Sequence, residues 1–302
     1  MHNAQQMSQE QSPRNDATLG SVVPIVEYAS EAGHYYLPDG TPFYSVPNKS
    51  KPGKFRPVTI TDARKVGAVP SVTTVTGLIK GEGLINYIRK QVFQATLACP
   101  YALKDETPEA HMARALAMAE QHKEKAAERG TSLHADIEHY MSSTGLVTDK
   151  WMPHINKLVD TLKQLAIDLN DGSPEKSFAH PLGFGGKCDW HCGSDPGDLT
   201  MPPIEAIVID FKSKDSIEPG KRYAYDEHAM QVASYAIGLG LGIRATRCIN
   251  VFIGEQDERI LVHEWPEADL QSAWEQFKHL LAVWQIRKKY WPTFGPELQD
   301  EQ

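Results

Sequence analysis

The sequence has few cysteines, no long hydrophobic run and no excess of basic residues. Four cysteines in 302 residues do not suggest a disulfide framework. The longest apolar stretches, around 237–243 and 280–286, are much shorter than the roughly 20 residues of a membrane-spanning helix. A net charge of −8 argues against a broad non-specific grip on nucleic acid. These absences favour a soluble cytoplasmic protein with no membrane partner.

The composition is that of an ordinary globular protein. Hydrophobic residues make up 41% and charged residues 23% of the chain, which is long enough to bury a full core. Residues 1–20 are rich in Gln, Asn and Ser and contain no apolar block. We therefore expect a disordered tail there, and neither a signal peptide nor a membrane anchor.

An apolar run, Ile204-Glu-Ala-Ile-Val-Ile-Asp-Phe-Lys212, ends with an acid and a lysine two positions apart. Residues at i and i+2 share one face of a strand, so Asp210 and Lys212 should point the same way. Upstream, Phe184-Gly-Gly-Lys-Cys-Asp-Trp190 supplies Asp189 after two glycines that allow close backbone approach. Two carboxylates can hold a hard cation, and a lysine can steady or deprotonate the attacking water in phosphodiester cleavage.

Two helical segments carry further polar candidates. In Arg129-Gly-Thr-Ser-Leu-His134, Gly130 is expected to end one helix and Thr131 to cap the next, which places His134 in the first turn. Glu138, four residues later, can accept a proton from one imidazole nitrogen and leave the other for metal.

Farther along, Gln231 and Tyr235 share one face of a predicted helix over 226–241 and can hydrogen-bond phosphate or bases. Each of these features also has a plainer explanation. Asp210 and Lys212 can form a surface ion pair at a strand end. His134 can face solvent, and Gln231 and Tyr235 can be the polar edge of an amphipathic helix.

In this order, His134, Asp189, Asp210-Phe-Lys212 and Gln231-x-x-x-Tyr235 resemble the RecB-type branch of the PD-(D/E)xK nuclease superfamily. Pro70-Ser-Val-Thr-Thr-Val75 and Gly83-Leu-Ile-Asn-Tyr87 are similar to the N-terminal segment of stand-alone phage exonucleases and of the mitochondrial genome maintenance exonuclease. The matching pieces run from about position 70 to about 240.

The resemblance implies roles for individual residues. His134, Asp189 and Asp210 would be metal ligands for Mg²⁺ or Mn²⁺, with the backbone carbonyl of Phe211 as a further oxygen ligand. Lys212 would be the catalytic lysine. Gln231 and Tyr235 would be the substrate-side motif that shapes the site, and with Asp189, Asp210 and Lys212 they would make up the catalytic set. Glu175, in the preceding strand, is not assigned as a ligand.

Some related nucleases hold an iron-sulfur cluster with one cysteine before the nuclease core and three after it. The four cysteines here do not follow that arrangement, and we predict no cluster: they are Cys99, Cys188, Cys192 and Cys248. Cys188-Asp-Trp-His-Cys192 can be half of a zinc site, but no matching ligand pair occurs elsewhere in the sequence. We expect the cysteines to fill the core.

The implied fold class is α/β, with a PD-(D/E)xK restriction-endonuclease-like core, a mixed central sheet flanked by helices, and helical N-terminal additions. The expected strands cover 176–180, 186–191, 204–212, 246–253 and 259–264, and a last helix covers 267–290. The expected regions are a tail over 1–20, a strand-rich segment over 21–70 with an Asp39-Gly40 hairpin, a helical part over 71–171, a catalytic core over 172–292, and a tail over 293–302.

The sequence thus predicts a metal-dependent deoxyribonuclease, an exonuclease of recombination, replication or repair. Its expected partner is DNA that is single-stranded or has free ends, and a recombination protein is a further candidate partner; a phage-encoded enzyme would act in the host cytoplasm. A structure- or sequence-specific endonuclease, a non-catalytic DNA-binding subunit and a zinc-binding interaction module remain as alternatives. Basic residues that could contact DNA fall around Lys49–Arg56, Lys80–Lys90 and Lys212–Arg222.

Overall fold

The centre of the molecule is a five-stranded mixed sheet. The computed structural model describes residues 34–79, 82–99, 106–142, 147–193 and 205–292. The strands lie in the order β10-β9-β8-β7-β6. They are β6 (Ser173–His180), β7 (Phe184–Cys192), β8 (Ala206–Lys214), β9 (Thr246–Gly254) and β10 (Ile260–Glu264). Within this sheet β8 and β9 are parallel and the other neighbours are antiparallel, so the sheet is mixed, as predicted. The five predicted strands are also confirmed.

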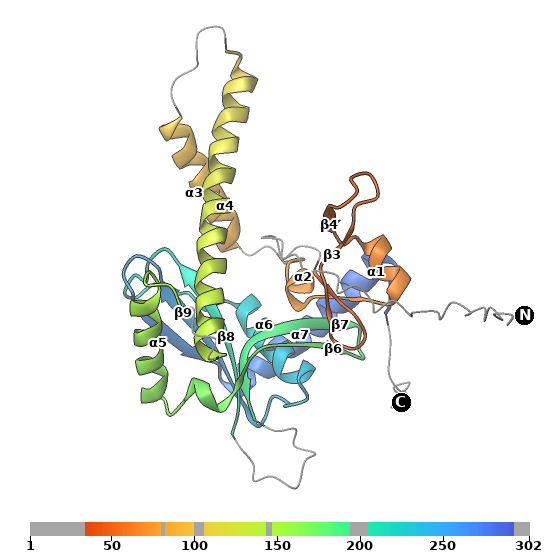
Figure 1. Cartoon of the computed structure of the whole chain (residues 1–302), viewed down its shortest axis with the longest axis vertical. Helices are drawn as coiled ribbons and strands as arrows, with labels where there is room; N and C mark the ends of the chain where they lie inside the picture. The colour runs from red at the N-terminus through yellow and green to blue at the C-terminus, as the bar shows by residue number, and fades with distance from the viewer. Residues whose placement is uncertain (1–33, 80–81, 100–105, 143–146, 194–204, 293–302) are drawn as a thin grey trace, which may run out of the picture.

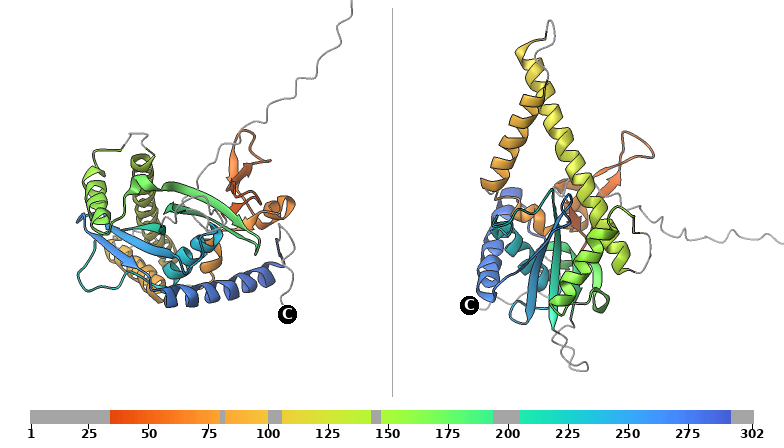
Figure 2. Two further views of the ribbon diagram at one scale, coloured as in Figure 1. Left: turned by 90° about the horizontal axis from the view of Figure 1, so that it is seen from below. Right: turned by 90° about the vertical axis from the view of Figure 1, so that its left-hand side faces the viewer.

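Helices cover both faces of this sheet, and the molecule therefore has three layers (Figure 1; Figure 2). Helix α6 (Asp226–Gly238) makes the crossover between β8 and β9 and packs with α7 (Glu267–Lys288) on one face, where Val208 and Phe252 are buried. Helices α4 (Pro108–Met141) and α5 (Met152–Gln164) cover the other face, where Ile209 and Val251 are buried. A strand buried on both faces needs a nearly continuous apolar run, which β8 has.

Helix α4 does not follow the prediction. It runs unbroken for 34 residues from its N-cap at Thr107, with Pro108 in the first turn, so the expected break at Gly130 and the expected cap at Thr131 are wrong. Gly130 instead allows close packing, because a Cβ there would lie 2.8 Å from Ser213 Oγ of β8. A single glycine costs a helix only about 1 kcal/mol, which tertiary packing can offset.

The N-terminal half of α4 and helix α3 (Glu82–Ala98) form an arm that projects from the body (Figure 1; Figure 2). Its apolar side chains are unusually exposed, with Phe93 at 64% and Leu97 at 71%.

A short 3₁₀ turn, η1 (Leu169–Asp171), leads from the α5 region into the sheet. Among the described residues, none of the helices combines the length and the hydrophobicity of a membrane span.

A small strand-rich layer precedes the helices. It contains β1 (Tyr35–Tyr36), β2 (Pro42–Phe43) and β5 (Val69–Pro70) in one sheet, the hairpin of β3 (Ser45–Pro47) and β4 (Phe55–Pro57), and helices α1 (Ile60–Val66) and α2 (Val72–Thr76). The predicted Asp39-Gly40 turn is confirmed: Leu37 N donates to Thr41 O, and Gly40 has φ +86°. A bridge between Ser71 and Gly185 attaches this layer to β7.

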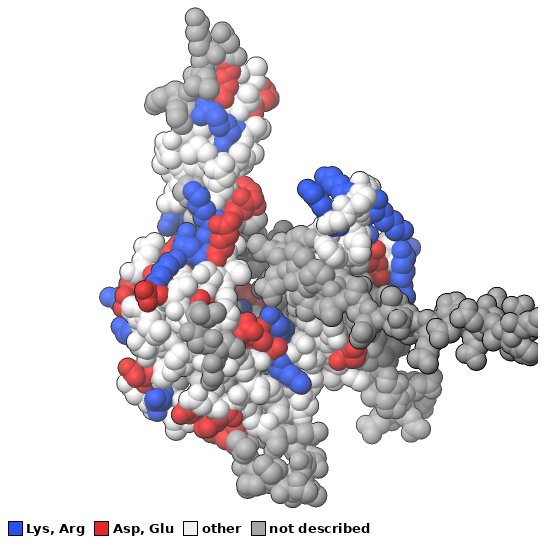
Figure 3. Space-filling view, in the orientation of Figure 1, with Lys and Arg blue, Asp and Glu red and all other residues white. Residues whose placement is uncertain are grey.

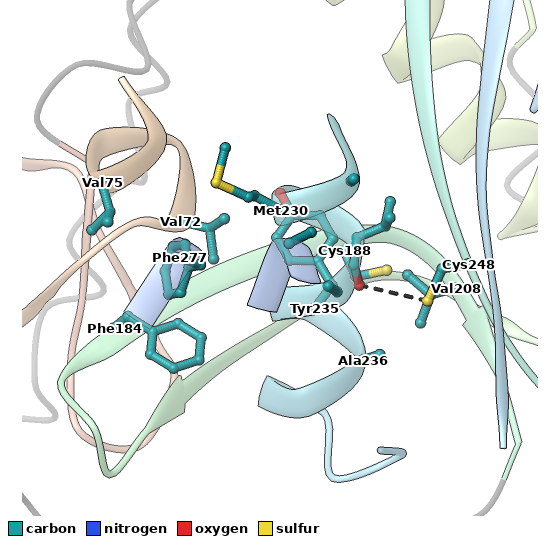
Figure 4. Packing of buried hydrophobic residues seen from close by; sticks show 14 of the residues in the cluster. Val72, Val75, Phe184, Cys188, Val208, Met230, Tyr235, Ala236, Cys248 and Phe277 are labelled. Carbon is teal, nitrogen blue, oxygen red and sulfur yellow. Dashed lines mark hydrogen bonds between the residues drawn. The ribbon is translucent and has the colours of Figure 1, made fainter. Parts of the chain in front are cut away.

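Cys188, Cys192 and Cys248 lie in the hydrophobic cores, as expected, whereas Cys99 is buried in the arm, where Arg114 donates to its sulfur. All four are buried free thiols. Figure 4 shows two of them in the core between α6 and the sheet, where Met230, Tyr235 and Ala236 of α6 lie over Cys188 and Val208. The predicted tails, 1–20 and 293–302, lie outside the described residues.

Candidate functional site

Strands β7 and β8 separate at the two aspartates that the sequence singles out. The two strands pair from Cys192 and Ile207 to Trp190 and Ile209, and this pairing stops before Asp189 and Asp210. Beyond that point β7 continues to pair with β6, while β8 continues with β9. Both carboxylates therefore lie where the sheet opens.

At this opening, the side chain of Asp189 takes the place of a backbone hydrogen-bond acceptor of β7. Phe211 N donates to Asp189 Oδ2 at 2.7 Å. On either side of Asp189, Cys188 and Trp190 belong to the cores on opposite faces of the sheet. Since residues at i and i+2 of a regular strand share a face, β7 changes its orientation at Asp189.

Asp210 is only 1% exposed and accepts hydrogen bonds on both carboxylate oxygens. Gln231 Nε2 donates to Oδ1 at 2.8 Å, and Lys212 Nζ donates to the same atom at 3.0 Å. Asn250 Nδ2 donates to Oδ2 at 2.7 Å. The shared face of Asp210 and Lys212 is thus confirmed, and the pair is not a surface ion pair.

Helix α6 supplies the other predicted side chains. Gln231 Nε2 also donates to Tyr235 OH at 2.8 Å, so these two residues share one helix face as predicted. Both are buried and form the surroundings of Asp210 rather than a polar helix edge. The expected close approach at the glycines is also confirmed, because a Cβ on Gly186 would lie 2.8 Å from Tyr235 Cε1.

His134 reaches the site from the other helical layer. It lies inside α4 and not in a first turn, so the local prediction was wrong. Its Nδ1 is nevertheless 3.9 Å from Asp189 Oδ2, and its side chain is 33% exposed. The proposed hydrogen bond from the His134 imidazole to Glu138 stays a prediction, and so does ligation by the Phe211 carbonyl.

A third carboxylate, Glu175, is brought next to Asp189. Residues on both sides of it pair with β7, namely Pro174 with Trp190 and Lys176 with Cys188, which places Glu175 opposite Asp189. Glu175 has φ +56°, a left-handed conformation that marks a local distortion of β6, and its carboxylate forms an ion pair with Lys187. The sequence did not assign Glu175 to the site.

Burial and mutual repulsion perturb the carboxylates of the site. Burial raises the pKa of Asp210 to about 6; Asp189 adds to the rise, and the Lys212 ammonium opposes it. Burial also raises the pKa of Glu175 to about 7, with Asp189 and Glu138 adding to the rise and Lys187 opposing it. The site therefore concentrates negative charge that its neighbouring cations compensate only in part.

Asn250 completes the surroundings of Asp210 and was missed from the sequence. It is fully buried, lies opposite Asp210 in the parallel pairing of β8 and β9, and accepts from Trp265 Nε1 at 2.7 Å. A polar residue inside the apolar run Cys248-Ile-Asn-Val-Phe-Ile253 was the available signal, because buried amides are normally hydrogen-bonded.

This donor set suits a hard cation. Carboxylate oxygens with raised pKa values, and an imidazole beside one of them, are groups that a divalent cation would stabilise in their unprotonated form. Within the described ranges, no three His, Cys, Asp or Glu side chains already converge as a metal cluster. Both oxygens of Asp210 accept hydrogen bonds and Lys212 Nζ lies 3.0 Å from each of them, so a cation bound by this carboxylate would compete with the Lys212 ammonium.

Known proteins identify no family for this chain. No protein-family model matches the chain. No curated protein matches it. A solved structure described as the crystal structure of SSO0001 is 20% identical over 41% of this chain and 57% of its own chain, with a TM-score of 0.24. The chain thus spans a little over half the length of SSO0001, and an overlap this small carries no argument.

Proposed function

We propose that the chain is a Mg²⁺- or Mn²⁺-dependent deoxyribonuclease with a PD-(D/E)xK core of the RecB type, and that it acts as an exonuclease. The observation that supports this most directly is the convergence of Asp189, Asp210 and Lys212 at the point where β7 and β8 separate. Residues from five elements, α4, β7, β8, α6 and β9, meet there.

Asp189, Asp210 and His134 would hold the cation. When bound, the cation would neutralise charge on the scissile phosphate and lower the pKa of a bound water. Lys212 lies 3.0 Å from Asp210 and can donate a hydrogen bond to the attacking water or to a phosphate oxygen once that carboxylate binds metal. Gln231 and Asn250 keep Asp210 in one orientation by their hydrogen bonds to its two oxygens.

The exonuclease assignment rests on the sequence resemblance near residues 70–87. Part of that segment contacts β7, the strand that carries Asp189. Pro70-Ser-Val-Thr-Thr-Val75 forms the end of β5 and most of α2, where Ser71 bridges to Gly185 and Val72 and Val75 join the core that contains α6. This placement favours a role for the segment in supporting the β7 side of the site.

The test is a cleavage assay on linear single-stranded DNA, linear duplex labelled at either end, and a closed circle, each with Mg²⁺, Mn²⁺ or EDTA. We expect metal-dependent loss of linear DNA, intact circles, and a rate about 10²–10⁴-fold lower for Lys212→Ala. Lys157→Ala, at an exposed position of α5 outside the basic segments that could contact DNA, is the matched control and should cleave normally.

The other outcomes assign the alternatives. Cut circles would show an endonuclease of the same fold. If no metal supports cleavage by the wild-type chain, the proposed activity is wrong and a non-catalytic DNA-binding subunit becomes the better explanation.

A further inference from the structure

The β3–β4 hairpin concentrates positive charge in an otherwise acidic protein. Residues 45–57, Ser-Val-Pro-Asn-Lys-Ser-Lys-Pro-Gly-Lys-Phe-Arg-Pro, contain four basic residues and no acid, whereas the whole chain has a net charge of −8. Figure 3 shows Lys and Arg side chains gathered on this hairpin. A chain that binds a polyanion despite a net negative charge must place its cations locally.

Three of these cations are available to a partner. Lys49, Lys51 and Lys54 are exposed, and none of the ion pairs formed within the described residues involves them. Arg56 differs from them, because its guanidinium forms two hydrogen bonds with Asp62 of α1, at 2.7 and 3.0 Å. Within the hairpin, Arg56 thus attaches the strands to α1, whereas the three lysines remain exposed.

The loop that carries the lysines is held in one shape. Asn48 N donates to Lys54 O at 2.7 Å, Lys54 N donates to Lys51 O at 3.0 Å, and Ser50 N donates to Asn48 Oδ1 at 3.0 Å. A loop with these internal hydrogen bonds presents its ammonium groups with a smaller entropic cost of ordering than a flexible tail would.

The hairpin is also tied firmly to the body. Asp62, which binds Arg56, closes a capping box with Thr59 at the start of α1. At the other end of α1, Arg64 donates to the carbonyl of Lys288, and Tyr290 OH donates to Ala68 O at 3.0 Å. Helix α1 therefore connects the loop that carries the lysines to the C-terminal end of α7.

The position of the loop suits a substrate that extends beyond the candidate site. Figure 1 shows the β3–β4 hairpin rising from the same side of the body as the α3–α4 arm, with α2 between them. The same N-terminal layer reaches β7 through the bridge between Ser71 and Gly185, four residues before Asp189. A long polymer held at the opening between β7 and β8 could thus also reach the hairpin.

We propose that the loop of Lys49, Lys51 and Lys54 is a second contact for the phosphate backbone of a nucleic acid, separate from the candidate site; the proposal rests on the nuclease function proposed above. Lysines read phosphates as point charges without base specificity. The loop otherwise contains Asn48, Ser50, Pro52 and Gly53 and no large apolar side chain that would insert into a lipid surface.

The contact has a quantitative signature. Neutralising Z phosphates gives a slope of log affinity against log salt of about −0.9Z for duplex DNA and about −0.7Z for single strands. With three lysines engaged, their removal should reduce the magnitude of the slope by about 3 for duplex and about 2 for single strands. At 50 mM salt the Kd should rise about tenfold or more.

The experiment measures fluorescence anisotropy of labelled single-stranded and duplex oligonucleotides over 50–200 mM KCl. The full chain carries Lys212→Ala and is kept in EDTA, so that no cleavage interferes. The test variant adds Lys49→Gln, Lys51→Gln and Lys54→Gln. The control adds Lys150→Gln, Lys157→Gln and Lys163→Gln, which remove the same charge from exposed positions at and in α5.

We expect weaker binding and a reduced salt slope for the hairpin variant and little change in slope for the α5 variant. Equal affinities and slopes for the two variants would overturn the proposal, even if the wild type cleaves DNA. Hairpin-dependent binding without any wild-type cleavage would support this contact while refuting the nuclease. The same two variants are also compared for binding to phosphatidylserine vesicles. Hairpin-dependent binding to the vesicles but not to DNA would overturn the proposal in favour of a membrane surface.

Discussion

Asp210 is the buried charge around which the candidate site is arranged. Individual hydrogen bonds offset the free-energy cost of burying its carboxylate. Asn250 donates to Asp210 and accepts from Trp265, each at 2.7 Å, and is fully buried. Removal of a partner from a buried hydrogen bond leaves the other group without compensation for its lost hydration, at a cost of about 1–3 kcal/mol, more for a charged group. Asn250 is linked to two such groups.

We therefore expect Asn250→Ala to lower the free energy of unfolding by about 3–4 kcal/mol. Trp265→Phe removes the indole donor and part of the ring but leaves Asp210 paired with Asn250, and should cost about 1–3 kcal/mol. Urea denaturation of the two variants and of the double mutant measures both costs and their coupling. If Asn250→Ala costs nothing in the Trp265→Phe background, where only its bond to Asp210 remains to be lost, that bond does not stabilise the fold.

These residues also show how far the sequence could predict the site. The common face of Asp210 and Lys212 follows from the two-residue period of a strand, and that of Gln231 and Tyr235 follows from the helical period. The position of Asn250 beside Asp210 depends on the register between β8 and β9, which long-range packing sets. Local patterns contain no information about that register.

Helix α4 illustrates the same limit at the scale of an element. Gly130 was expected to break the helix, but its missing Cβ allows α4 to approach Ser213 at the end of β8. The strands were easier to predict, because apolar runs such as that of β8 are buried on both faces. The choice between a helix break and a close contact depends on what packs against the glycine.

Replacement of Gly130 by alanine tests this explanation. The substitution should gain about 1 kcal/mol of helix propensity. The new Cβ would lie 2.8 Å from Ser213 Oγ, so we expect the gain to be largely cancelled in Gly130→Ala. In a Ser213→Ala background, the same substitution should stabilise the protein by about 1 kcal/mol in thermal unfolding. Equal effects in the two backgrounds would contradict the contact.

The start of α6 contains a histidine that should make stability depend on pH. His228 Nδ1 accepts from Tyr225 N at 3.1 Å, and burial, with Lys212 and Lys214 nearby, lowers the pKa of His228 to about 3. Its pKa in the unfolded chain is about 6.5. As pH falls, the unfolded chain therefore binds this proton before the folded chain does. The neutral imidazole of His228 contributes stability above pH 6.5, and this contribution is lost as pH falls towards 3.

His228→Gln should remove this dependence and keep the cap, because glutamine at the third helical position can accept the same bond. Between pH 7.5 and 5, we expect the wild type to lose about 2 kcal/mol more than the variant in urea denaturation. His279→Gln, at an exposed position of α7, is the control and should behave as the wild type. Parallel pH profiles for wild type and His228→Gln would refute the assignment.

At the scale of the whole molecule, the site lies where elements from all three layers meet an opening in the sheet. His134 comes from one helical layer, Gln231 from the other, and the carboxylates from the sheet between them. The sequence indicated the α/β layers through its apolar runs. It could not indicate that β7 and β8 separate at Asp189, or that Glu175 would lie opposite, because both depend on strand pairing.

The carboxylates of this opening should link metal binding to global stability. Burial raises the pKa of both Asp210 and Glu175, and repulsion from Asp189 adds to the rise, so a bound cation should stabilise the folded chain. At a concentration ten times its Kd, Mg²⁺ or Mn²⁺ would add about 1.4 kcal/mol, and EDTA should reverse the gain. Differential scanning calorimetry at several metal concentrations measures this as a rise in Tm.

Asp189→Asn separates the role of this charge from that of its hydrogen bond, because an amide oxygen can still accept from Phe211 N. Without metal, the variant should be at least as stable as the wild type, since a repulsive charge is removed. With metal, its Tm should rise much less. Asp160→Asn, on the exposed face of α5, should keep the full rise. A full metal-dependent rise in Asp189→Asn would place the cation elsewhere and remove the main electrostatic support for the proposed site.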